Sequence, residues 1–460
     1  MPDAHSACHG GPGRRGWAGA RVVLVVAVLA ALLSAGLHGT SATGASANDG
    51  LNPHPVVLHR PPQQALSALA LIGKRMFSDP RLSASGRQSC ASCHSPTHAF
   101  GPPDGTRMQV GGASMTVQGV RAIPSLAYLY RQEAFGIGPA GDDDAPVALE
   151  MLAAQARGAT RSTKSAGMAP ATAALVPSGG LFWDGRADSL MDQAMGPMMN
   201  PAEMANANVA EAAARLVRAG YAEVLRPLFG EGLAAKPDLL FAEAMSAISR
   251  YQIEDGAFHR FDSRYDHWLE GKARLTAAQM RGLRLFNDPA KGNCAACHVS
   301  APGRDGMPPL FTDTEYEALG VPRNRKLKVN HDPHHIDLGL CGPIRGDLAE
   351  QMQYCGMFLT PTLRNTARRG VYFHNGVYHT LEQVLNFYNR RNTNPAMIYP
   401  RNAAGRIMLY DDLPRPYHVN IDVADAPFDR KAGQKPPLSK QDIGDIIAFI
   451  KTLDDGDALR

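Results

Sequence analysis

The chain has 460 residues, of which 44% are hydrophobic and 20% are charged, and its formal net charge is +4. These values are ordinary for a globular protein. The charge is too small for the strongly basic surface of a nucleic-acid-binding protein, and the length predicts two or three domains.

Residues 1–47 have the pattern of a secretory signal peptide. Three arginines between residues 14 and 21 precede an uncharged apolar stretch over residues 22–37, and an Ala-Ser-Ala cleavage site follows at residues 45–47. The alternative is an uncleaved anchor, but the apolar stretch is short for a bilayer, which requires about 20 residues. Both interpretations place the rest of the chain outside the cytoplasm, and we expect it in the periplasm, where disulfides can form.

The chain contains two C-x-x-C-H motifs, formed by Cys90, Cys93 and His94 and by Cys294, Cys297 and His298. This motif attaches a c-type haem: both thiols form thioether bonds to the porphyrin, and the histidine binds the iron. Zinc ribbons also use paired C-x-x-C motifs, but those pairs lie much closer together, about 15–20 residues apart. The sequence therefore predicts two covalently bound haem c groups.

Two further cysteines, Cys341 and Cys355, belong to neither motif and lie beyond the signal peptide. In an oxidising compartment two remaining thiols most simply form a disulfide. The alternative is a pair of unbonded buried cysteines.

Similar segments precede the two haem motifs, Gly-Lys-Arg-Met-Phe-Ser-Asp-Pro at residues 73–80 and Gly-Leu-Arg-Leu-Phe-Asn-Asp-Pro at residues 282–289. Each predicts a short amphipathic helix ending at Asp-Pro, and Thr276 with Gln279 forms a capping box before the second. This self-similarity predicts two cytochrome-like domains, at residues 48–270 and 271–460. The expected fold class is mainly α, with long loops.

Each predicted domain ends in a helix, near residues 239–251 and 443–453, because apolar side chains recur there at helical spacing. Residues 136–180 differ in composition and predict a surface insertion. The acidic run at residues 142–144 is interpreted as solvated rather than as a cation site. The same holds for the cluster of histidines at residues 331–335, where a metal site is the alternative.

Four further stretches resemble the bacterial di-haem cytochrome c peroxidase and MauG family. They are Phe-Trp-Asp-Gly-Arg-Ala-Asp-Ser-Leu at 182–190, Asn-Pro-Ala-Glu-Met at 200–204, Thr-Pro-Thr-Leu-Arg-Asn at 360–365, and Tyr-Phe-His-Asn-Gly at 372–376 followed by Thr-Leu-Glu-Gln at 380–383. With the haem motifs they span nearly the whole mature chain in family order. The resemblance implies two mainly helical cytochrome c-like domains, in which the N-terminal haem reacts with hydrogen peroxide and the C-terminal haem transfers electrons.

The resemblance also assigns catalytic roles to three side chains. Glu203 matches the acid–base glutamate above the N-terminal iron, and Gln193 matches the glutamine that hydrogen-bonds peroxide. The alternative for Glu203 is a carboxylate at a helix N-terminus. Trp183 matches an electron relay between the haems, and its alternative is a core aromatic residue.

Axial ligands distinguish the branches of the family. No histidine lies between His98 and Trp183, so we expect the N-terminal haem to have an open face. On the C-terminal iron, Tyr388 matches the tyrosine ligand of MauG-type members, and Met357 is the alternative. A phenolate favours ferric iron and lowers the potential, whereas a thioether favours ferrous iron.

One position departs from the family pattern. Ala122 replaces an asparagine that helps to bind calcium between the haems, which puts a calcium ion in doubt. His374 matches a family histidine without an assigned role.

The expected function is a periplasmic peroxidase with MauG-like axial ligation, which takes electrons from a small cytochrome c or blue-copper protein. The alternatives are a MauG-type enzyme that oxidises residues of a partner protein and a non-catalytic di-haem electron-transfer cytochrome. No nucleic-acid partner and no stable membrane span after signal cleavage are expected.

Overall fold

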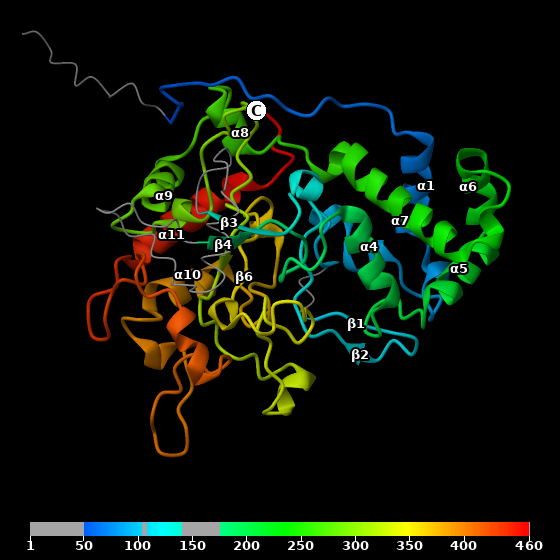
Figure 1. The fold of residues 1–460 in the computed structure, drawn as a ribbon. Coiled ribbons are helices and arrows are strands. Elements are labelled where there is room, and N and C mark those ends of the chain that lie inside the picture. The colour runs from blue at the N-terminus through cyan, green and yellow to red at the C-terminus, as the bar shows by residue number, and fades with distance from the viewer. Residues whose placement is uncertain (1–49, 104–107, 140–174, 460) are drawn as a thin grey trace, which may run out of the picture. The chain divides into compact units, whose positions relative to one another are not determined.

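Two packed pairs of helices form the framework of the computed structural model, which describes residues 50–103, 108–139 and 175–459 (Figure 1). Helix α1 (Ala68–Phe77) packs against α7 (Pro237–Glu254), and α9 (Ala277–Asn287) packs against α11 (Lys440–Ile450). The described residues belong to one compact unit. The fold is mainly helical, as the sequence predicts.

A glycine lies at the contact point of each pair. A Cβ atom on Gly73 of α1 would lie 1.9 Å from the carbonyl oxygen of Ala247 in α7, and a Cβ atom on Gly282 of α9 would lie 1.9 Å from that of Asp445 in α11. No side chain fits in such a gap. Both glycines stand at the start of the repeated sequence segments, so the repeat specifies the same close helix contact twice.

The other helices have four to ten residues. Helices α1, α4, α5, α6 and α7 gather on one side of Figure 1, and α9, α10 and α11 on the other. The remaining helices are α2 (Cys90–Cys93), α4 (Leu190–Met199), α5 (Val209–Arg218), α6 (Tyr221–Phe229), α8 (Arg264–Leu269) and α10 (Leu381–Arg390). Three antiparallel strand pairs join β1 (Val110–Gly111) to β2 (Val117–Gln118), β3 (Gly136–Pro139) to β4 (Leu175–Ser178), and β5 (Tyr316–Glu317) to β6 (Phe358–Leu359).

Each helix pair has its own hydrophobic core. The first core is built from residues between 72 and 258, and the second mainly from residues between 265 and 453. Tyr265, Trp268 and Leu269 pack in the second core, although they precede residue 271. The two-domain division at residues 270 and 271 stays a prediction.

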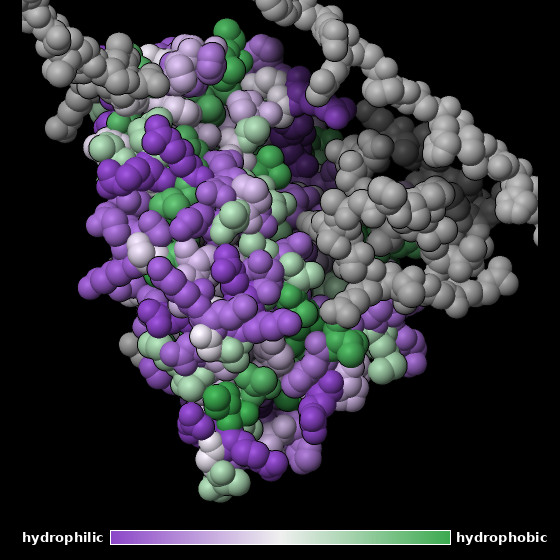
Figure 2. All heavy atoms as spheres, turned by 90° about the vertical axis from the view of Figure 1, so that its left-hand side faces the viewer, coloured by the Kyte–Doolittle hydropathy of each residue, from purple (hydrophilic) through white to green (hydrophobic). Residues whose placement is uncertain are grey.

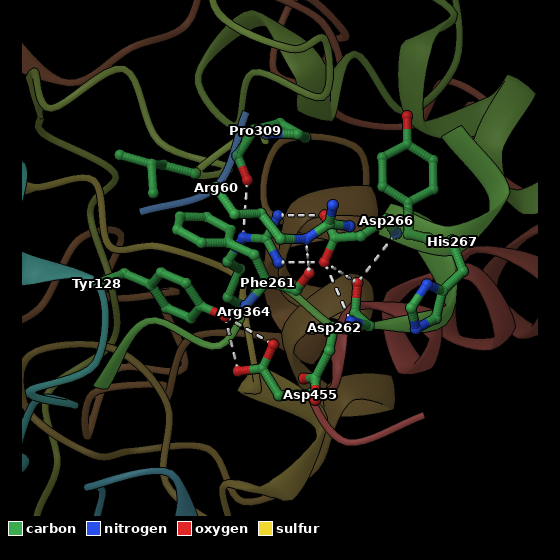
Figure 3. Close-up of polar contacts among 12 residues, drawn as sticks. Arg60, Tyr128, Phe261, Asp262, Asp266, His267, Pro309, Arg364 and Asp455 are labelled. Carbon is green, nitrogen blue, oxygen red and sulfur yellow. Dashed lines mark hydrogen bonds and ion pairs between the residues drawn. The ribbon is translucent and has the colours of Figure 1, made fainter. Parts of the chain in front are cut away.

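A buried polar network ties together segments that are far apart in the sequence (Figure 3). Arg364 donates two hydrogen bonds, of 2.9 and 2.7 Å, to the Asp266 carboxylate, and both side chains are fully buried. The Tyr128 hydroxyl donates to Asp455, whose carboxylate also accepts from Asn365. Residues from the N-terminal half, from α8 and from the last turn of the chain therefore meet at one point.

The ends of the predicted insertion are ordered as strands. Gly136 pairs with Ser178 and Pro139 with Leu175 in the β3–β4 ladder, an arrangement that the sequence did not predict. The acidic run at residues 142–144 lies outside the described residues, as does the predicted signal peptide at residues 1–47.

The surface seen in Figure 2 is mostly hydrophilic, with small groups of hydrophobic side chains. His331 and His334 are exposed, and within the described ranges no group of three or more His, Cys, Asp or Glu side chains is arranged to hold a metal ion. A disulfide joins Cys341 to Cys355. Among the described residues, no helix is both long and apolar enough to cross a bilayer.

Candidate active site

Both motif histidines are held in the same way. The Nδ1 atom of His94 donates to the carbonyl oxygen of Phe100 over 3.1 Å, and the Nδ1 atom of His298 donates to that of Phe311 over 2.9 Å. This hydrogen bond fixes the tautomer and leaves Nε2 unprotonated for a metal. Burial lowers the pKa of each imidazole to about 4, which keeps both neutral.

The two carbonyl groups belong to residues with the same backbone conformation, although they lie at different distances along the chain from their histidines. Phe100 has φ of 55° and Phe311 has φ of 56°, in the left-handed region that phenylalanine rarely adopts. Their rings make edge contacts with Phe77 at 6.2 Å and with Phe286 at 6.1 Å, and these two residues lie in the last turns of α1 and α9. In both regions, the same left-handed backbone conformation therefore positions the carbonyl group that accepts the hydrogen bond from the histidine.

The first motif opens onto a cavity of about 40 Å³. Gln193 of α4 and Glu203 line this cavity together with Cys90, Cys93 and His94. The structure therefore brings together five of the residues that the sequence selected, from three separate stretches of the chain.

Glu203 lies in the turn that follows α4, and not in the first turn of a helix. The alternative interpretation of a helix N-terminal carboxylate therefore does not hold. The Nδ2 atom of Asn200 donates to Glu203 Oε1 over 2.6 Å. Burial raises the pKa of Glu203, while the Asn200 hydrogen bond and the Arg186 guanidinium act in the opposite direction. A carboxyl group of this kind exchanges protons more readily near neutral pH than an exposed glutamate does.

The second motif lines a larger cavity of about 200 Å³. Tyr388, on α10, faces it together with Cys294, Cys297 and His298. The Tyr388 hydroxyl has no hydrogen-bond partner among the described residues. Burial raises the pKa of this phenol in the absence of a bound metal. Gly356 and Phe358 line the cavity, but Met357 between them does not.

Trp183 lines the second cavity and also a third cavity of about 70 Å³, which Gln193 lines as well. The Nε1 atom of Trp183 donates to the carbonyl oxygen of Ala122 over 2.8 Å. Trp183 therefore lies beside the second cavity and beside a cavity that shares Gln193 with the first, and a hydrogen bond fixes its ring. It is 8% exposed, so it also packs as a core residue.

Other motif residues have structural contacts. Asp184, after Trp183, accepts from Arg121 at 2.7 Å and from Arg186 at 2.6 Å. The imidazole of His374 stacks on Phe358 with ring centres 3.5 Å apart, and burial lowers its pKa to about 4. These contacts give structural roles to motif residues for which no catalytic role is proposed.

Sequence reasoning missed one residue of the site. Arg369 lines both the second and the third cavity. The only signal is a second arginine after Arg368, within the segment that joins two matched motifs. Nothing in that pattern indicates which arginine points inward.

Two cavities, each lined by a cysteine pair and by a neutral histidine with a fixed tautomer, fit the attachment of c-type haem. In the second cavity the other lining residues are predominantly apolar, as a porphyrin requires. In the first, Cys90, Cys93 and His94 would hold the group, and in the second Cys294, Cys297 and His298.

The sequence profile of the di-haem cytochrome c peroxidase family matches residues 67–274. The methylamine utilization protein MauG of Paracoccus denitrificans is 34% identical, over 73% of this chain and 79% of that protein. The cytochrome c551 peroxidase of Nitrosomonas europaea is 29% identical, over 79% and 83%.

Among solved structures, the di-haem peroxidase BthA of Burkholderia thailandensis is 34% identical and has a TM-score of 0.71. The alignment covers 87% of this chain and 88% of that chain. A tyrosine-to-methionine variant of the same peroxidase matches equally well, with a TM-score of 0.71.

The chain belongs to the family of di-haem cytochrome c peroxidases and MauG proteins. It is an oxidoreductase that acts on peroxide and carries two covalently bound c-type haems.

Proposed function

We propose that the chain reduces hydrogen peroxide to water at the N-terminal haem, with MauG-like axial ligation at the C-terminal haem. The observation that carries the proposal is the cavity in which Gln193 and Glu203 meet the first haem motif. A pure electron carrier does not require an acid–base group in this place, so the cavity favours an enzyme over a non-catalytic cytochrome.

The bound haem supplies the iron at which peroxide is activated. Glu203 takes the proton from the inner peroxide oxygen and delivers it to the outer oxygen, which leaves as water when the O–O bond breaks. Two electrons from the donor protein and two further protons would then convert the inner oxygen to a second water. The Gln193 amide orients the substrate by hydrogen bonding. Asn200, bonded to Oε1 over 2.6 Å, holds the carboxylate in place.

An open N-terminal haem face supports direct reaction with peroxide. Among the described residues, His94 is the single histidine that lines the first cavity. His98 bonds to Ser95 through Nδ1 instead. We expect electron paramagnetic resonance of the oxidised protein to show one high-spin haem. Two low-spin haems with bis-histidine signals would contradict the proposal.

Tyr388 is proposed as the sixth ligand of the C-terminal iron, because its hydroxyl faces no protein partner in the second cavity. Trp183 is proposed as the relay for electrons between the two haems. A tyrosine ligand favours the MauG-type alternative, in which the oxidising equivalents are passed to residues of a partner protein.

The proposed location is the periplasm, and the proposed electron donor is a small cytochrome c or blue-copper protein. Ala122 is buried and has no side-chain oxygen, so this position does not supply the ligand that the family uses for calcium, and a calcium ion stays in doubt.

The decisive test is peroxide turnover with a reduced cytochrome in Glu203→Gln. We expect kcat/KM to fall by about 10²- to 10⁴-fold, the usual contribution of a general acid–base group. Glu223→Gln is the matched control, because Glu223 is exposed on α6, and this variant should retain full activity. Equal activity in both variants would contradict the assignment.

The alternatives give different results in the same assay. An electron-transfer cytochrome would show no turnover in the wild type. A MauG-type enzyme would show slow turnover with the cytochrome, but would oxidise its partner protein after addition of peroxide.

A further inference from the structure

Arg369 is half-buried, and its contacts differ from those of other arginines in the interior of the described chain. Arg364 and Arg121 each form ion pairs with buried carboxylates. Arg391 has no carboxylate partner, but its Nε, Nη1 and Nη2 atoms all donate to oxygen atoms. Arg369 has one hydrogen bond, from Nη2 to the carbonyl oxygen of Ile123 over 2.8 Å, and its buried Nε has no partner.

An incompletely paired guanidinium is costly away from water. Arginine stays protonated in proteins, so the group cannot escape the penalty by losing its proton. Burial lowers the pKa of Arg369, and the only opposing influence is the hydroxyl of Tyr372. No carboxylate of the described residues compensates the charge. An anion that is not part of the polypeptide would do so.

The position of Arg369 indicates which anion that is. The residue lines the second cavity, where the C-terminal haem binds, and also the third cavity, which it shares with Trp183. The third cavity in turn shares Gln193 with the first cavity, where the N-terminal haem binds. Arg369 therefore lies at the junction of the two haem sites.

Haem c carries two carboxylates, because the thioether bonds use the vinyl groups and leave both propionates free. A guanidinium matches a carboxylate with two parallel N–H···O bonds, which makes arginine well suited to this contact. The free Nε and the neighbouring Nη atoms provide such a pair of donors.

We propose that Arg369 binds a haem propionate at the junction between the two haem sites. The pairing neutralises the propionate and raises the reduction potential of the haem that carries it. The inference depends on the presence of the two haems but not on the reaction proposed above, so its readout is redox titration rather than peroxide turnover.

The test compares Arg369→Gln with the wild-type holoprotein. Haem content is measured first, and the midpoint potentials of both haems are then obtained by spectroelectrochemical titration. Without the guanidinium the propionate charge favours ferric iron, so we expect one potential to fall by at least 59 mV, the equivalent of a tenfold change for a one-electron couple. The haem whose potential falls is the source of the propionate.

Arg284→Gln is the matched control, because Arg284 is exposed on α9 and its loss removes the same charge. Its two potentials should equal those of the wild type. Arg369→Lys keeps the charge but loses the bidentate contact, so we expect a smaller fall at the same haem. If Arg369→Gln does not fold, the potentials of Arg369→Lys alone test whether Arg369 pairs with a propionate.

Unchanged potentials in the Arg369 variants, with both haems present, would overturn the proposal and would mean that the guanidinium meets only water. An equal fall in Arg284→Gln would overturn it as well, because the effect would then be one of net charge. Failure of peroxide turnover in the wild type would leave these potentials measurable and the inference intact.

Discussion

The two haem regions share a framework and differ in what they place around the cavity. In both, a glycine allows two helices to touch, and a phenylalanine carbonyl group holds the ligand histidine. The first cavity receives Gln193 and Glu203, whereas the second receives Tyr388 and is about 200 Å³ rather than about 40 Å³. The shared helix contact and histidine hydrogen bond serve to hold a haem, and we expect the differing cavity residues to set the reactivity of each iron.

The residues that differ all lie outside the repeated segments. In the sequence, Gln193 on α4 and Glu203 in the turn after it lie between the two helices of the first pair. Tyr388 on α10 lies in the sequence between the two helices of the second pair. A duplicated haem module can therefore acquire separate catalytic and electron-transfer roles without any change in its two packed helices.

A variant that disrupts the buried network of Figure 3 tests whether the two regions unfold as one cooperative unit. Arg364→Met leaves the Asp266 carboxylate buried without its partner, and we expect a loss of about 3–5 kcal/mol in the free energy of unfolding. The charge of Arg364 also lowers the pKa of Asp455, which accepts from Tyr128, so its loss weakens the link between the end of the chain and the N-terminal half. Calorimetry should then show two separate transitions.

The double variant Arg364→Met, Asp266→Leu serves as the control, because it removes both charges together. Its loss of stability should be much smaller than that of the single variant. Equal losses in the two proteins would show that packing, rather than the charge pair, maintains this junction.

The helix contacts test whether the framework is needed in both regions. Gly282→Ala places a Cβ atom against the carbonyl oxygen of Asp445, where 1.9 Å is available. We expect destabilisation of about 3 kcal/mol, the upper end of the usual over-packing cost. Chemical denaturation of the holoprotein measures the change, and Gly73→Ala should have a similar effect in the first region.

Gly444→Ala, on the partner helix α11, is the matched control, since nothing lies within 4 Å of its added Cβ atom. This variant should be as stable as the wild type, or more stable by about 0.5–1 kcal/mol because alanine favours the helix. A comparable loss at Gly444 and Gly282 would refute the close-contact explanation.

The difference between the cavities is tested most directly at Tyr388. In Tyr388→Met a thioether replaces the phenolate, and we expect the potential of the C-terminal haem to rise by more than 59 mV, a tenfold change. The N-terminal potential should stay within a few millivolts of its wild-type value. An unaltered C-terminal potential, measured by redox titration, would rule out ligation by Tyr388.

The pH dependence of peroxide turnover gives the smallest and most specific test. Glu203 must be ionised to accept the peroxide proton, so activity falls as the pH drops through its pKa. Burial raises that pKa above the usual 4.5, which places the acidic limb of kcat/KM above pH 4.5. Asn200→Ala removes a hydrogen bond that lowers the pKa, so the limb should move to higher pH.

Glu203→Gln should show no such limb in its residual activity. If the acidic limb persists in this variant, the titrating group is not Glu203. The pH dependence would then say nothing about the difference between the two cavities.

Local signals in the sequence predicted the parts of the fold that local chemistry determines. The capping box of Thr276 and Gln279 starts α9 as expected, and Ser439 with Asp442 starts α11. The haem motifs were also predictable, because attachment requires its cysteines and histidine within five residues.

Contacts between distant segments were not predictable. Phe100 and Phe311 act through their carbonyl groups, and any residue type has a carbonyl. Asp266 lies far from Arg364 in the sequence, and nothing in either segment indicates their pairing. Arg369 was missed for the same reason, since its environment comes from cavities that the whole fold creates.

The β3–β4 ladder has an evolutionary consequence. Because Pro139 and Leu175 face each other across paired strands, the intervening stretch leaves and rejoins the scaffold at neighbouring points. Its length and composition can therefore be exchanged without shifting the scaffold on either side. The ladder therefore marks a place where the length of the chain can change while the residues of the two cavities keep their positions.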